Sequence, residues 1–233
     1  MRIVSWNCNG ALRKKLGALC TLDADIYVVQ ECEDPARSTD ANYKAWAENY
    51  LWIGPTKNKG LAVFARSAIS LKQVDLDAGL LELFLPCIIN GDTALLAAWT
   101  RQANSPNFGY IGQLWKYLQA HASFLKAEKA MLVGDLNSNT HWDEWDRWWN
   151  HSDVVNDLKA LGLESCYHQV AGEEQGKETQ PTFFMYRKPE KPYHIDYAFL
   201  SQALLPSAKL EIGNIETWLE YSDHMPVVVD ISG

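Results

Sequence analysis

Apolar residues along this chain follow two patterns, and each pattern predicts a different kind of element. Between residues 108 and 126 they recur at intervals of three or four, which places one apolar stripe on a helix. Similar spacing predicts helices over residues 14–21, 41–49, 108–126 and 153–161. Short apolar runs between turn-forming residues predict strands over residues 2–6, 26–30, 60–66, 80–89, 94–99, 130–133, 181–186, 195–200 and 226–231.

The order of these elements predicts the fold class. Some strands follow one another directly and others are separated by a helix, so we expect an α/β protein with packed sheets flanked by helices. The 233 residues are 47% hydrophobic and include 10 Trp, enough for one substantial core. Because no repeat, low-complexity tract or linker divides the chain, we expect a single domain over residues 1–233. The polar, Gly-containing residues 171–180 predict a loop.

Charge and cysteine content narrow the function classes. The net charge of -8 gives no broad basic face for a polyanion, so a phosphate-bearing substrate would need a local attraction such as a bound divalent cation. The five cysteines form no CxxC pair and no zinc spacing, which predicts reduced, mostly buried thiols. No signal-peptide pattern opens the chain and no apolar run approaches the ~18 residues of a membrane span, so we expect a soluble, cytoplasmic protein.

Polar residues stand at the ends of several predicted strands. Asn7, Glu31 and Asp135 each end an apolar run, and Asp223 with His224 precedes the last one. If the last strand is antiparallel to its neighbours, these groups converge on one edge. Each also has an ordinary explanation, because Asn residues form turns and short acidic runs form solvated loops.

Asp196 is harder to explain by structure alone. It lies inside the apolar run "HIDYAFLS", where an ionised carboxylate is costly unless it is paired or coordinated. The adjacent acid and imidazole of Asp223 and His224 also suit proton transfer.

Five motifs together are more specific than any single residue. In chain order they are "SWNCNG", "VVQE", "GDLNS", "HIDYAFLS" and "SDHMPVVVDI". Their order and content resemble the endonuclease/exonuclease/phosphatase superfamily, which contains exonuclease III and DNase I-like enzymes. The resemblance covers nearly the whole chain. It implies a four-layered α/β sandwich, in which two packed mixed β-sheets are flanked by helices, with a Mg²⁺-dependent phosphoesterase site on one edge.

The resemblance also implies roles near the metal and the attacking water. Glu31 would be a principal ligand of Mg²⁺, which Mn²⁺ could replace, and Asn7 would help to hold the cation. Asp135 would orient or deprotonate the attacking water. Asn137 would hydrogen-bond the phosphate.

Two further strand-end motifs complete the implied site. Asp196 would join the acidic cluster, either near the metal or steering the leaving group. His224, oriented by Asp223, would contact the scissile phosphate. Such groups suit the chemistry, because a hard cation neutralises the charge of a phosphodiester while a base aims the water in line.

Substrate contacts are less well defined. In "ALLAAWTRQ", where many relatives carry a His or Tyr phosphate contact, Arg101 is a candidate, although an ordinary surface arginine is an equal explanation. Asn9 is a second candidate. For Trp142 and Trp145, with Trp148 and Trp149, the spacing predicts core packing or a helix face, and the alternative is a stacking platform for bases.

The favoured function is therefore a Mg²⁺-dependent phosphodiesterase, specifically a nuclease that cleaves DNA or RNA. A small nucleotide or another phosphoester is the substrate alternative. A noncatalytic binding or scaffold protein with the same fold is the functional alternative. The sequence indicates no membrane contact and no obligate protein partner.

Overall fold

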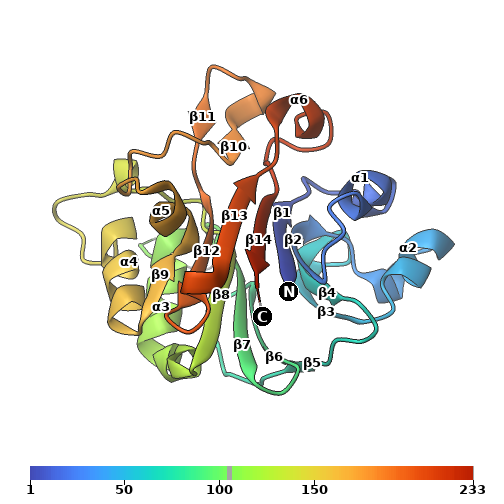
Figure 1. Ribbon diagram of the computed structural model, residues 1–233, viewed down its shortest axis with the longest axis horizontal. Helices are drawn as coiled ribbons and strands as arrows, with labels where there is room; N and C mark the ends of the chain where they lie inside the picture. Colours follow the sequence, from blue (N-terminus) through green and yellow to red (C-terminus); the bar gives the residue numbers. More distant parts are fainter. Residues whose placement is uncertain (104–106, 233) are drawn as a thin grey trace.

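The computed structural model describes residues 1–103 and 107–232, and two six-stranded sheets pack face to face at its centre (Figure 1). Both sheets are mixed, because β1 is parallel to β2 and β7 to β8 whereas the other pairs are antiparallel. In spatial order the first sheet contains β13 (Ala208–Ile212), β14 (Val227–Ile231), β1 (Arg2–Asn7), β2 (Ile26–Cys32), β4 (Lys59–Ala65) and β3 (Tyr50–Thr56). The second contains β5 (Leu71–Gln73), β6 (Phe84–Ile89), β7 (Thr93–Trp99), β8 (Lys129–Asp135), β12 (Asp196–Ser201) and β9 (Leu163–Ser165).

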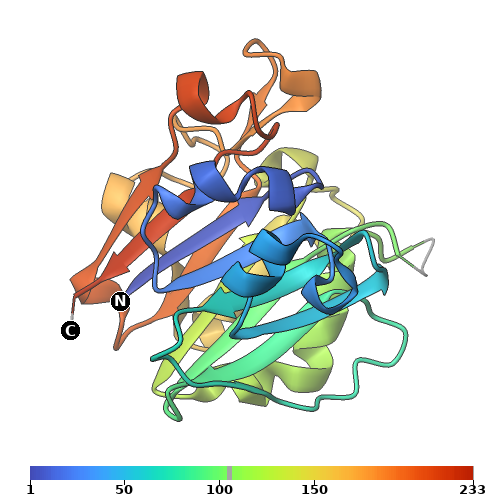
Figure 2. The same ribbon diagram turned by 90° about the vertical axis from the view of Figure 1, so that its right-hand side faces the viewer.

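Helices cover the outer faces of both sheets, which gives four layers. Figure 2 shows α1 (Leu16–Cys20) and α2 (Ala41–Trp46), in blue, in front of the first sheet. On the opposite side, α3 (Ile111–His121) and α4 (His151–Ala160) pack on the second sheet (Figure 1). The remaining elements are α5 (Cys166–Ala171), α6 (Ile215–Trp218), the hairpin of β10 (Phe183–Phe184) and β11 (Pro192–Tyr193), and six 3-10 turns at Leu12–Lys14, Pro35–Arg37, Ala122–Lys126, Thr140–Trp142, Met185–Arg187 and Leu205–Ser207. The predicted four-layered α/β sandwich is confirmed.

The apolar runs are continuous because the central strands are buried on both faces. In β1, Ile3 faces the core between the two sheets, whereas its neighbour Val4 faces the core beneath the outer helices. Across the molecule, Leu114 of α3 packs against Leu132 of β8 in a third core. A strand with two buried faces needs no polar alternation, which explains why its sequence reads as a plain apolar run.

Several element boundaries differ from the sequence prediction. The strand predicted at 80–89 begins only at Phe84, because Leu83 has a φ of 64° that breaks the extended run. The strand predicted at 181–186 is extended only at Phe183–Phe184 and then turns into a 3-10 segment, with Tyr186 at a φ of 58°. The helix predicted at 108–126 divides into α3 and a 3-10 turn.

The prediction missed β3, β5, β9, β11 and β13, as well as α5 and α6. The two residues of β11 are too few to show the alternation of a strand. The strands β3, β5, β9 and β13 are short or lie at sheet edges, where fewer positions are buried and the apolar pattern is weak. The two helices have six and four residues, too few to show helical spacing.

Strand direction brings the polar ends to one edge of the sandwich. β14 is antiparallel to β1, so its beginning lies where β1 ends and the condition for the polar groups to converge on one edge is met. β12 is antiparallel to β8, and its register places Asp196 directly opposite Asp135. The chain termini lie at the other end, where the Met1 amino group donates to the Ile231 carbonyl at 2.7 Å.

The thiols match the sequence prediction. All five cysteines are free, and only Cys20 is exposed. Across residues 1–103 and 107–232, no helix combines the length and apolar character that crossing a membrane requires. The loop predicted at 171–180 is present over residues 172–180, since Ala171 ends α5. Glu173 fixes this loop by accepting hydrogen bonds from Tyr167 Oη and the Thr179 amide at 2.6 and 2.9 Å.

Candidate active site

Asp135 ends β8 at the centre of the polar edge, and Gly134 makes this position possible. A Cβ at Gly134 would lie 1.8 Å from the Ala98 carbonyl oxygen, so only glycine allows β7 to approach so closely. The Asp135 carboxylate is fully buried and accepts hydrogen bonds from Asn7 Nδ2 at 2.9 Å and from the Asn137 amide nitrogen at 2.8 Å. Its orientation is therefore fixed from two sides.

Asn137, two residues after Asp135, helps to hold the Asp135 carboxylate. Its backbone adopts a left-handed φ of 43°, which asparagine tolerates better than most residues. Its Nδ2 donates to Asp135 Oδ2 and to the Thr100 carbonyl, both at 3.0 Å. Both amide hydrogens are thus engaged within the protein, and a phosphate contact by Nδ2 would need one of these bonds to open.

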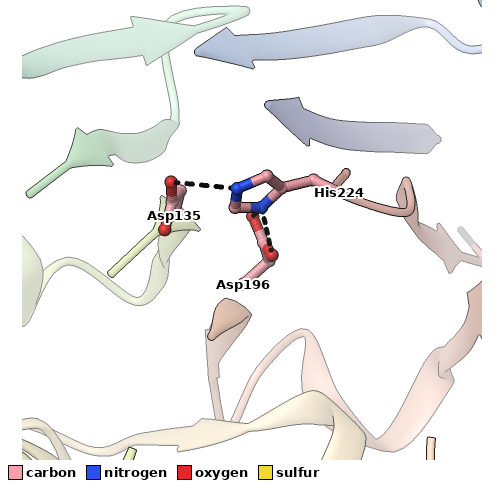
Figure 3. Close-up of side chains that lie close together, drawn as sticks. All are labelled: Asp135, Asp196 and His224. Atoms are coloured by element: carbon pink, nitrogen blue, oxygen red, sulfur yellow. Dashed lines mark hydrogen bonds and ion pairs between the residues drawn. The ribbon is translucent and has the colours of Figure 1, made fainter. Parts of the chain in front are cut away.

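His224 lies between two carboxylates (Figure 3). Its Nδ1 is 2.9 Å from Asp196 Oδ2, whereas its Nε2 is 3.9 Å from Asp135 Oδ2, beyond hydrogen-bond distance. Phe183 packs against the imidazole with ring centroids 4.6 Å apart. The side chain is therefore held on one nitrogen and free to donate from the other.

The carboxylate that orients His224 is Asp196, so the predicted role of Asp223 in this task is wrong. Asp223 instead accepts a hydrogen bond from Asn9 Nδ2 at 2.9 Å. The Asn9 backbone amide donates to Asn7 Oδ1 at 3.0 Å. Asn9 and Asp223 thereby tie the loop after β1 to the loop before β14, which contains His224.

The pKa values of His224 and Asp135 are both raised. Burial alone would lower the pKa of His224, but the negative charges of Asp196 and Asp135 and the hydrogen bond to Asp196 outweigh it and raise that pKa to about 9. Burial and the charge of Asp196 raise the pKa of Asp135 to about 7, although His224 and Asn7 oppose the shift. His224 and Asp135 together therefore retain at least one proton near neutral pH.

Glu31 reaches the same edge through a β-bulge. The register between β2 and β4 shifts between Gln30 and Cys32, and Glu31 has a left-handed φ of 62°. Such a bulge re-aims one side chain without ending the strand. Gln30 is the register partner of Asn7, so Glu31 lies beside the end of β1.

Lys59 forms an ion pair with Glu31 through Oε2. Within residues 1–103 and 107–232, Glu31 Oε1 has no hydrogen-bond partner. This half-buried carboxylate, near the amide of Asn7, offers the oxygen ligands that Mg²⁺ prefers.

A second group also has suitable ligand atoms for a cation. The ligand atoms of Asp135, Asp196 and His224 lie within 4.8 Å of one another. However, the short contact between His224 and Asp196 is a hydrogen bond, and a cation there would have to displace its proton. The two groups therefore suit different tasks, proton handling in the buried cluster and cation binding at Glu31.

The candidate substrate contacts lie in different surroundings. Arg101 stacks its guanidinium 5.9 Å from the ring centroid of Trp99, and Trp145 is 95% exposed. Trp142 lies in the wall of a cavity that also includes Asn137. The helix-face explanation for the Trp-rich segment is wrong, because the segment is not helical between the Thr140–Trp142 turn and α4. Core packing holds for Trp149, which packs against the third core, whereas Trp145 and Trp148 are exposed.

Sequence reasoning missed three side chains that shape the site. Ser222 Oγ accepts from the His224 amide at 3.0 Å and donates to the Asn7 carbonyl at 2.7 Å. Thr182 Oγ1 accepts from the Asp196 amide at 3.0 Å. Phe183 covers the imidazole. Ser222 is the first residue of the motif "SDHMPVVVDI", but no spacing rule points to the other two.

The model of the Endonuclease/Exonuclease/phosphatase family matches residues 4–224. The chain belongs to this family. Members of the endonuclease/exonuclease/phosphatase family are phosphoester hydrolases. The match covers nearly the whole chain, as the resemblance of the five motifs does. A comparison with curated protein sequences gave no match.

Solved structures with the same fold are similar over their full length. A 3′ phosphatase, NExo, from Neisseria, bound to a product DNA hairpin, has a TM-score of 0.73 at 20% identity, with all of both chains covered. The 3′-5′ exonuclease NExo from Neisseria meningitidis has a TM-score of 0.72 at 21% identity, again with full coverage of both chains. An AP endonuclease from Archaeoglobus fulgidus has a TM-score of 0.72 at 18% identity and the same coverage. At these identities the likeness establishes the shared fold.

Proposed function

We propose that this protein is a Mg²⁺-dependent phosphodiesterase that hydrolyses nucleic acid, with DNA as the preferred substrate class. The observation that carries the proposal is the buried Asp135–His224–Asp196 cluster at one edge of a sandwich from the endonuclease/exonuclease/phosphatase family. A scaffold protein has no evident use for two buried carboxylates and an imidazole in contact, because burying such groups is costly.

Asp135 would take the proton of the attacking water. A base in this role needs a pKa near the working pH, and the raised pKa of Asp135, about 7, fits that need. Asn7 and Asn137 keep the carboxylate in place through their side-chain amides.

His224 would bind the scissile phosphate. Its Nδ1 is engaged by Asp196, which leaves Nε2 to donate to a phosphate oxygen. The raised pKa keeps the imidazole positively charged at neutral pH, and a charged donor binds an anionic oxygen more strongly than a neutral one does. Asp196 is thus a positioning residue that acts through His224.

Glu31, with Asn7 beside it, would hold Mg²⁺ or Mn²⁺. Glu31 pairs with Lys59 through Oε2, and no other described residue bonds to its carboxylate, which supports this assignment, as does the all-oxygen character of the donors. When bound, the cation would neutralise charge on the phosphate. That local attraction would allow a chain of net charge -8 to bind a polyanion.

DNA is preferred because the solved structures of similar fold include a DNA-bound 3′ phosphatase, a 3′-5′ exonuclease and an AP endonuclease. RNA, small nucleotides and other phosphoesters are the alternatives. The five free thiols support a reducing, cytoplasmic location.

A hydrolysis panel tests the proposal. Wild type and Asp135→Asn would be assayed with Mg²⁺, with Mn²⁺ and with EDTA on double-stranded DNA, single-stranded DNA, RNA, nucleotides and bis(p-nitrophenyl) phosphate. We expect metal-dependent cleavage of a DNA substrate by the wild type and a loss of about 10²- to 10⁴-fold in the folded variant. Absence of cleavage of every substrate by the wild type would contradict the proposal and favour the scaffold alternative.

A further inference from the structure

A cavity of about 580 Å³ lies directly beside the candidate active site. Asn137 belongs to both, since it holds Asp135 and also lines the cavity. Tyr110, Trp142 and His151 contribute other parts of the wall. The volume is in the range of small-molecule sites in proteins. We propose that this cavity, which we call the base cavity, binds the intact base of the nucleotide next to the scissile phosphate. The inference rests on the proposed nuclease function and specifies its substrate.

The wall of the base cavity is aromatic and partly open. Trp142 and Tyr110 are 42% and 46% exposed, which is high for large apolar rings. Deeper in the wall, Trp149 is covered by the guanidinium of Arg147 at 4.5 Å from its ring centroid. Exposed aromatic rings stack on nucleobases with little sequence preference.

Charge distinguishes the base cavity from the rest of the surface. The chain carries a net charge of -8, yet no carboxylate is among the described residues that line the cavity, and Arg147 is. An anionic, aromatic ligand such as a nucleotide fits this wall better than a cationic one does. The adjoining cluster would receive the phosphate while the cavity receives the base.

His151 gives the cavity wall a polar acceptor, and a chain of hydrogen bonds fixes its tautomer. Burial opposes the charged form of Glu178, but hydrogen bonds from His168 and Gly176 outweigh it and lower the pKa of Glu178 to about 2. The ionised carboxylate can only accept, so His168 Nε2 donates to it at 3.1 Å. His168 Nδ1 then accepts from Ser165 Oγ at 2.7 Å and from Gln175 Nε2 at 3.2 Å.

The same chain continues to His151. Gln175 Oε1 faces His151 Nε2 at 3.2 Å, so that nitrogen carries the proton and Nδ1 is left as an acceptor. His151 is 1% exposed, and its Nδ1 has no hydrogen-bond partner within the described residues. A buried acceptor without a partner is costly, and a ligand that donates an N–H to it removes that cost.

The fitting ligand is therefore a flat ring that carries an N–H donor, as nucleobases do. A base inside a duplex cannot enter a side cavity unless it leaves the stack. The base cavity thus selects an unpaired, terminal or extruded nucleotide. It also favours an intact base over an abasic sugar, which would leave both the aromatic wall and His151 without partners.

Matched oligonucleotides test this preference. One DNA strand would carry adenine at the cleaved position, and the other a tetrahydrofuran abasic residue. We expect the wild type to cleave the adenine strand with about tenfold higher kcat/KM than the abasic strand, because its KM for the adenine strand is lower. Trp142→Ala should reduce that ratio toward one, whereas Trp148→Ala, an exposed tryptophan outside the cavity wall, should preserve it. A wild-type preference for the abasic strand would overturn the proposal.

A third strand isolates the His151 contact. Unsubstituted purine lacks the exocyclic amine of adenine, so we expect weaker cleavage of the purine strand by the wild type and equal cleavage of both by His151→Phe. Phenylalanine retains a ring against Tyr197, whose ring centroid is 5.1 Å from that of His151. Equal cleavage of adenine and purine strands by the wild type would overturn the assignment of His151.

Direct binding separates this proposal from the proposed function. Deoxyadenosine monophosphate and deoxyribose 5-phosphate would be titrated against the metal-free protein by calorimetry. Tighter binding of the nucleotide, lost in Trp142→Ala and kept in Trp148→Ala, would support the base cavity even if no substrate were cleaved. Equal or absent binding of the two ligands, with hydrolysis intact, would overturn the base cavity alone.

Discussion

The buried Asp135–Asp196 pair and the half-buried Glu31 lie at the same edge of the sandwich, yet their surroundings differ. Asp135 and Asp196 are almost fully buried and flank an imidazole, so their negative charges raise the pKa of His224 and keep it protonated at neutral pH. Glu31 is more exposed and has only a lysine as partner on one oxygen. Because Mg²⁺ retains several waters when it binds, the more open carboxylate is the better ligand. Exposure therefore divides one acidic edge into a proton site and a cation site.

The strongest test of the proton site is Asp196→Asn. Loss of this carboxylate removes the main attraction that stabilises the imidazolium, so the pKa of His224 should fall from about 9 toward its ordinary value near 6.5. We expect kcat to fall about 10²-fold. Imidazole NMR titration and kcat against pH would measure the two effects.

Asp223→Asn is the matched control, since Asp223 bonds to Asn9 and not to the imidazole. Its effect on the pKa of His224 should be the smaller of the two. A larger effect from Asp223→Asn would restore the orienting role that the sequence had suggested for Asp223.

The cation site is tested by Glu31→Gln. Removing the charged ligand should weaken Mg²⁺ binding by about tenfold or more, with activity partly recovered at high Mg²⁺. Calorimetric titration would give the dissociation constant, with Glu211→Gln on the edge strand β13 as a surface control. Unchanged Mg²⁺ affinity in Glu31→Gln would show that the cation does not bind at Glu31.

A smaller effect tests whether carboxylates, and not burial, set the charge of His224. His151 is also buried but faces the neutral Gln175, and burial lowers its pKa to about 4. The unfolded chain takes up a proton below about 6.5, so stability is present above that pH and is lost as pH falls toward 4.

The unfolding free energy of the wild type should decrease between pH 7 and 4.5. In His151→Gln that decrease should be about 2 kcal/mol smaller. Urea denaturation at the two pH values would measure it, and His141→Gln on the surface should leave the loss unchanged. An identical loss in both variants would show that His151 is charged in the folded protein.

The position of the site was predictable from the sequence because strand direction decides it. Asn7 and Asp135 end apolar runs, and an antiparallel last strand places His224 at the same edge, as the structure confirms. The resemblance placed Asp196 in the acidic cluster, but no sequence pattern gave the pairing of β12 with β8 that sets it opposite Asp135.

The partners of these residues were less predictable. Asp223 precedes His224 in sequence, but side chains of adjacent residues point apart on extended backbone, and the contact comes from Asp196, 28 positions away. The ion pair of Lys59 with Glu31 depends on a β-bulge that no spacing pattern shows. The exposed tryptophans are ambiguous in sequence because the same spacing fits a buried helix face.

The division into a proton site and a cation site is tested most directly by Mg²⁺ binding to Asp135→Asn, measured beside its hydrolysis of DNA. The account predicts that this variant binds Mg²⁺ as tightly as the wild type does and yet fails to cleave. Loss of Mg²⁺ affinity in Asp135→Asn, with affinity retained in Glu31→Gln, would place the cation in the buried cluster and contradict the account.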